Sequence, residues 1–105
     1  MTSAPANAAR GETAVSVGGS TFVVRPSFEA LVAAEEELGS LFALVERASS
    51  GELKLGEMTS LIWHCLELKN RPSREEVGAA LLATGLISAT QPVRAILAQV
   101  LKGLS

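Results

Sequence analysis

His64 and Cys65 stand next to each other and are the only histidine and the only cysteine of the chain. A cysteine activated by a histidine is a common nucleophile, so this pair is the first candidate for catalysis. Neighbouring residues of a helix point about 100° apart, however, so their side chains do not face each other. Cys65 also falls on the apolar face of a predicted helix, which favours buried packing over catalysis.

Other residue types that carry chemistry are absent or isolated. All eleven acidic residues are glutamates, which excludes EF-hand calcium loops, aspartate-based triads and Walker-B ligands. One carboxylate cluster, Glu35-Glu36-Glu37, is better explained as a solvated helix face than as a cation site. The Gly18-Gly19 pair is too short for a phosphate-binding loop and precedes a strand. The sequence predicts a protein that is not an enzyme, with no catalytic, cofactor-binding or metal-binding residues and no cofactor.

Length and composition indicate one intracellular globular domain. The chain has 105 residues, of which 48% are hydrophobic and 19% are charged. A net charge of −2 and a pI of about 5.4 give no general attraction to nucleic acid or to anionic membranes. One cysteine is compatible with a reducing compartment, and no apolar run approaches the ~18 residues of a membrane span. We therefore expect a cytoplasmic protein that binds neither nucleic acid nor membrane.

The charges are distributed unevenly between the two halves of the chain. Residues 1–57 contain eight glutamates and four Lys or Arg residues, whereas residues 58–105 contain three glutamates and five Lys or Arg residues. This polarity could favour head-to-tail association into a homo-oligomer. An ordinary solvated surface also explains it and is the preferred interpretation.

The segment TAVSVGGSTFVVRP, residues 13–26, predicts a β-hairpin. A two-residue Gly-Gly turn sets the register, which pairs Val17 with Ser20, Val15 with Phe22, and Thr13 with Val24. The apolar side chains of both strands then share one face, and Glu12 lies opposite Arg25. Because an isolated hairpin is marginally stable, this face either covers the helices as a lid or its edge pairs with another chain. We favour the lid.

Helix caps divide the rest of the chain into five helices. Ser27 and Ser40 are N-cap residues, and Ser73 with Glu76 forms a capping box. Thr90 is placed to cap the last helix, with Pro92 in its first turn. The predicted fold is α+β and mostly α, with an N-terminal hairpin packed on a bundle of short helices. It has a flexible stretch at 1–9 and a single domain at 10–105, which contains a hairpin at 12–25 and helices at about 27–38, 40–48, 57–69, 74–84 and 91–102.

Several large apolar side chains fall outside the core-facing stripes of these helices. Phe42 lies at the edge of its stripe, and Trp63 and Leu82 lie well away from theirs. Val23 lies on the hairpin face opposite the apolar one. A second buried helix face explains the three helical residues as well as a partner-binding patch does. Val23, Phe42, Trp63 and Leu82 are the candidate partner-binding residues.

A series of motifs extends along nearly the whole chain. It begins with NAARGETAVSVGGSTFVVRPSFEALVAAEEELGSL, which contains an RGE triplet, the hairpin and an RPSF motif. It continues in GELKLGEMTSLIWHCL and PSREEVGAALLATGL. With these motifs the chain resembles the small tail proteins of gene transfer agents and related tailed phages. Such proteins are described as tail assembly chaperones and sometimes as tail tube proteins.

The resemblance implies a non-enzymatic role in tail morphogenesis. The protein would bind the tape-measure protein and bring tail tube subunits to it. A second hypothesis is a structural tail tube component that remains in the particle. A third is a small bacterial regulator, but Arg71, Arg74 and Arg94 are too sparse for a nucleic-acid-binding surface.

Overall fold

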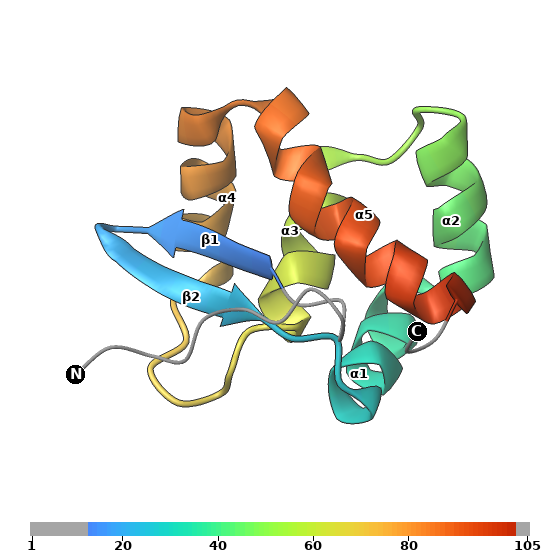
Figure 1. The fold of residues 1–105 in the computed structure, drawn as a ribbon, viewed down its shortest axis with the longest axis horizontal. Coiled ribbons are helices and arrows are strands. Elements are labelled where there is room, and N and C mark those ends of the chain that lie inside the picture. The colour runs from blue at the N-terminus through green and yellow to red at the C-terminus, as the bar shows by residue number, and fades with distance from the viewer. Residues whose placement is uncertain (1–12, 103–105) are drawn as a thin grey trace.

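A two-stranded hairpin precedes five helices in the computed structural model of the protein, which describes residues 13–102 (Figure 1). The elements are β1 (Thr13–Val17), β2 (Ser20–Val24), α1 (Phe28–Leu38), α2 (Leu41–Ser49), α3 (Leu55–His64), α4 (Arg74–Thr84) and α5 (Leu86–Lys102). The predicted α+β, mostly helical fold is confirmed. In this part of the chain, no helix has both the length and the apolar character needed to cross a membrane.

The hairpin has the predicted register. Val15 pairs with Phe22 and Val17 pairs with Ser20, in an antiparallel ladder. Gly18 and Gly19 have φ angles of 59° and 83°, which a two-residue turn of this type requires and which glycine adopts without strain. The predicted pair between Glu12 and Arg25 falls at residue 12, outside the described residues, as does the flexible stretch predicted at 1–9.

The apolar face of the hairpin closes one side of the helical core. β1 contacts both α4 and α5, and the side chains of Val17 and Val24 are buried. The end of β2 is held from its other side, because the Arg25 N–H donates to the Cys65 carbonyl at 2.8 Å and Val24 forms a bridge with Leu66. The hairpin is therefore a lid on the core, as the sequence indicated.

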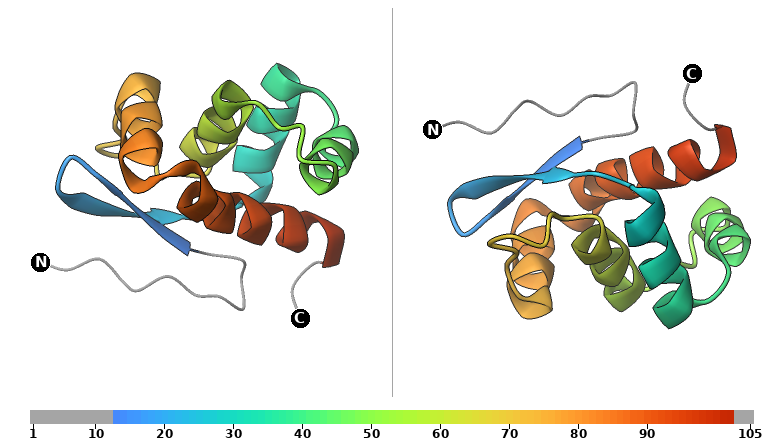
Figure 2. Two further views of the ribbon diagram at one scale, coloured as in Figure 1. Left: turned by 90° about the horizontal axis from the view of Figure 1, so that it is seen from above. Right: turned by 90° about the horizontal axis from the view of Figure 1, so that it is seen from below.

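Helix α3 lies at the centre of the fold. It packs against α1 on one side and α4 on the other, and α5 crosses the three of them (Figure 2). The stripe predicted for this helix is buried throughout, at Met58, Leu61, Ile62 and Cys65. Side chains of α2, α4 and α5 complete the core, with Leu44, Val77 and Ile96 fully buried.

The helix predicted at 57–69 has different ends in the structure, where α3 spans Leu55–His64. It begins earlier because the Glu57 carboxylate accepts a hydrogen bond from the Lys54 N–H at 2.9 Å, so no serine or threonine cap is needed. It ends earlier because the backbone of Cys65 and Leu66 pairs with the end of β2 and the residue after it. This end of the helix is set by a contact distant in sequence, and no residue near it in the sequence indicates it.

The start predicted for the last helix, at residue 91, was also wrong. Helix α5 begins at Leu86, directly after Gly85 ends α4 with a φ of 101°. Thr90 is not a cap, since its hydroxyl donates to the Ile87 carbonyl at 2.6 Å. Pro92 lies inside the helix, where it cannot donate to the carbonyl four residues earlier. Burial of Ala89 and Pro92 explains why the helix continues through this position.

Candidate protein-binding groove

An open groove of about 690 Å³ lies between α1, the end of α3 and the segment 65–73 that joins α3 to α4. Two other hollows are smaller, at about 220 and 300 Å³. Helix α1 contributes the small side chains of Ala30 and Ala33, and the joining segment contributes Leu68 and Arg71. Leu68 is 80% exposed, so the groove presents an uncovered apolar side chain beside charged ones.

Trp63 fixes the joining segment next to the groove. Its indole N–H donates to the Pro72 carbonyl at 3.0 Å, which ties the last turn of α3 to the residue before the cap of α4. Asn70 turns the chain back with a φ of 61°, a conformation that asparagine tolerates better than most residues. Ser73 and Glu76 then form the predicted capping box, with hydrogen bonds of 3.1 and 2.9 Å.

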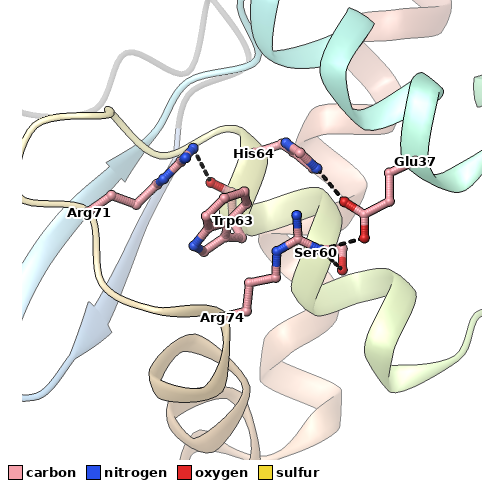
Figure 3. Close-up of polar contacts among 6 residues, drawn as sticks. All are labelled: Glu37, Ser60, Trp63, His64, Arg71 and Arg74. Atoms are coloured by element: carbon pink, nitrogen blue, oxygen red, sulfur yellow. Dashed lines mark hydrogen bonds and ion pairs between the residues drawn. The ribbon is translucent and has the colours of Figure 1, made fainter.

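Two guanidinium groups lie against the indole of Trp63. The guanidinium carbon of Arg71 lies 3.5 Å from the ring centroid, and that of Arg74 lies 4.2 Å from it. Arg71 also donates to the Trp63 carbonyl at 3.4 Å (Figure 3). Cation–π contacts of this kind stabilise partly desolvated arginines by about 0.5–2 kcal/mol. The Trp63 indole therefore orders two cations at the wall of the groove.

Glu37 joins this cluster to α1. Its carboxylate pairs with Arg74 and, at 2.7 Å, with Nε2 of His64, so one side chain links α1, α3 and α4 (Figure 3). The Arg74 hydrogen bond, followed by that from His64, lowers the pKa of Glu37 from 4.5 to about 2. Glu37 is therefore ionised at neutral pH.

The Glu35-Glu36-Glu37 cluster is not the uniformly solvated face that the sequence indicated. Glu37 belongs to the groove network, and Glu35 accepts a hydrogen bond from the Leu41 N–H at 3.1 Å, at the start of α2. These partners are distant or lie in the next element, so no spacing within the cluster points to them. Among the described residues, no group of three or more His, Cys, Asp or Glu side chains is placed to hold a metal ion.

Cys65 is packed in the core, as predicted. Its side chain is buried, and this burial raises the pKa of the thiol to about 12. A thiol with so high a pKa is not a nucleophile near neutral pH. His64 is directed to Glu37, with which it forms a hydrogen bond (Figure 3).

The four candidate partner-binding residues are not gathered at one place. Trp63 lines the groove, whereas Val23 is half-buried on β2. Phe42 on α2 is 71% exposed and Leu82 on α4 is 57% exposed, but these helices lie at opposite ends of the long axis (Figure 1). The sequence missed Leu68 because the predicted helix at 57–69 included it. It missed Arg71 because the arginine becomes part of a site only through contact with Trp63.

The comparisons with protein families identify a phage-type tail protein. Residues 10–103 match the family described as "Phage tail tube protein, GTA-gp10", and the chain belongs to this family of gene transfer agent tail proteins. The resemblance noted from the sequence is thereby confirmed. Comparisons with curated proteins and with solved structures give no significant match.

Proposed function

We propose that the protein is a non-enzymatic tail assembly chaperone that works in the cytoplasm. It binds the tape-measure protein and recruits tail tube subunits to it during tail morphogenesis. The observation that carries this proposal is the open groove beside Trp63, with Leu68 80% exposed at its wall. Leu68 differs from the other exposed apolar side chains in lining a groove, and the anchor residues of protein interfaces pack into pockets of this kind.

The chemistry of the groove suits a long helical partner. A tape-measure protein is a long chain whose apolar helix faces need cover until the tube closes around it. The small side chains of Ala30 and Ala33 leave room above α1, and Leu68 supplies an apolar contact. This arrangement is that of a helix-in-groove interface, in which an amphipathic helix lays its apolar face into a groove.

A second candidate function is a structural component of the tail tube. The description of the family as a tail tube protein favours it directly. A structural component would remain in finished particles, whereas a chaperone would leave before the tail is complete. The two functions therefore differ in a measurable quantity, the amount of this protein in purified particles.

The test is to purify the tagged protein together with the tape-measure and tail tube proteins of its own locus, and to analyse finished particles by mass spectrometry. The chaperone proposal predicts capture of the tape-measure protein and absence of the chain from particles. Retention in particles at a fixed ratio to tube subunits would support the structural function instead. Failure to capture either partner, together with absence from particles, would contradict both.

A further inference from the structure

We infer that Arg71 recognises a side-chain carboxylate on the polypeptide segment that occupies the groove. The segment would carry one glutamate or aspartate and a neighbouring apolar side chain that packs on Leu68. This inference deepens the proposed function and rests on it for the identity of the partner. Recognition of a carboxylate is inferred from the charges and contacts of the groove residues alone.

The first observation is an imbalance of charge around Trp63. Arg71 and Arg74 both lie on the indole, but one carboxylate, that of Glu37, reaches this pair of cations, and it is bound to Arg74. Among residues 13–102, no carboxylate lies within ion-pair distance of Arg71. Desolvation and the neighbouring Arg74 lower the pKa of Arg71, which is the direction expected for a cation beside a second cation. A second carboxylate would compensate the charge of Arg71.

The second observation is that the Arg71 guanidinium is already held in place. It stacks 3.5 Å from the centroid of the Trp63 ring and donates one hydrogen bond to the Trp63 carbonyl. Its planar group has further N–H donors, which suit a bidentate contact with a carboxylate. Because the side chain is ordered before binding, less conformational entropy is lost when the partner arrives.

The other charges of the groove limit how acidic the partner can be. Glu67 lines the groove and accepts a hydrogen bond from Arg25 at 2.6 Å. Glu29 also lines it, and no cation within the described chain lies at ion-pair distance from it. These two carboxylates disfavour a polyacidic segment. The groove therefore fits a single carboxylate beside an apolar residue, which an amphipathic helix presents at positions three or four apart.

The inference can be tested without the natural partner. The chain has one tryptophan and no tyrosine, so its fluorescence reports on Trp63 at the groove alone. The probes are a synthetic amphipathic helical peptide with one glutamate four residues from a leucine, and the same peptide with glutamine in place of the glutamate. Each is titrated into the wild type, the Arg71→Gln variant and the control Arg94→Gln, whose exposed arginine lies on α5.

We expect the glutamate peptide to bind the wild type and Arg94→Gln about ten-fold more tightly than the glutamine peptide. With Arg71→Gln the two peptides should bind with the same affinity. Equal binding of both peptides to the wild type, no binding of either, or an unchanged preference in Arg71→Gln would each overturn the inference. Displacement of the glutamate peptide by an equal concentration of inorganic phosphate would also overturn it, because the site would then be a general anion site.

Titration of the same proteins with the tape-measure protein separates the inference from the proposed function. Equal binding of the tape-measure protein to the wild type and Arg71→Gln would uphold the proposed function and overturn the inference. Absence of tape-measure binding, combined with a glutamate preference that depends on Arg71, would overturn the proposed function and leave carboxylate recognition standing.

Discussion

The hairpin and the segment 65–73 both flank the α3–α4 pair, and they meet where Val24 bridges to Leu66. Beyond this bridge they differ. The hairpin directs Val17 and Val24 into the core, whereas the segment leaves Leu68 80% exposed and holds Arg71 against Trp63. The hairpin therefore stabilises the fold, and the segment supplies a surface that remains available to a partner.

This difference means that stability and binding can be changed separately. Substitutions on the buried face of the hairpin should unfold the protein. Substitutions on the groove wall should leave it folded and change what it binds. Substitutions at Val24, Trp63 and Glu37 test that separation, and the substitution at Val24 has the largest expected effect.

Val24→Asp should abolish stable folding. Val24 is fully buried, and a carboxylate at this position would have no polar partner in the core. The expected loss in the free energy of unfolding exceeds about 4 kcal/mol. The matched control is Val23→Asp, which places the same charge on the opposite, half-buried face of β2 and should cost about 1 kcal/mol or less. Urea denaturation followed by circular dichroism measures both, and similar losses would contradict the lid function of the hairpin.

Trp63→Phe should destabilise the protein by about 1–2 kcal/mol. The phenyl ring cannot donate to the Pro72 carbonyl and is a weaker platform for Arg71 and Arg74. Phe42→Leu is the control, because Phe42 is 71% exposed and its replacement should change stability by less than about 0.5 kcal/mol. Urea unfolding monitored by circular dichroism is the measurement. A Trp63→Phe variant as stable as the wild type would show that the segment is held by other contacts.

Glu37→Gln should cost about 1 kcal/mol at neutral pH, since the ion pair with Arg74 and the hydrogen bond with His64 are partly exposed to solvent. The pKa of Glu37 is lowered from 4.5 to about 2, so its stabilising contribution is present above pH 4.5 and disappears as the pH falls toward 2. Thermal unfolding of the wild type and the variant should therefore converge across this range. The exposed neighbour provides the control Glu36→Gln, for which no pH-dependent difference is expected.

The parts of the fold that are set by residues close together in the sequence could be predicted. The Gly18-Gly19 turn fixes the hairpin register, and the Ser73–Glu76 capping box fixes the start of α4. The end of α3 could not be predicted, because it is set by β2, some forty residues earlier in the chain. Pro92 led to a wrong prediction for the start of α5 for a similar reason, because the burial of Pro92 in the core allows the helix to continue through it.

Less of the candidate site than of the fold could be predicted from the sequence. Trp63 was identified from its position off the apolar stripe, but its partners lie outside α3, in the segment 65–73 and at the start of α4. Glu37 and Arg74 are separated by 37 residues, and no periodicity relates them. Phe42 and Leu82 also lie off their stripes, but they belong to α2 and α4, which lie at opposite ends of the molecule (Figure 1).

The measurement that tests the central claim most directly is binding of the tape-measure protein to Leu68→Ser and to Ile87→Ser. The two residues are 80% and 90% exposed, so neither substitution should lower the thermal midpoint, but only Leu68 lies at the groove. We predict that Leu68→Ser binds about ten-fold more weakly than the wild type and that Ile87→Ser binds with unchanged affinity. Wild-type affinity of Leu68→Ser, or an equal loss in both variants, would contradict the groove as the protein-binding surface.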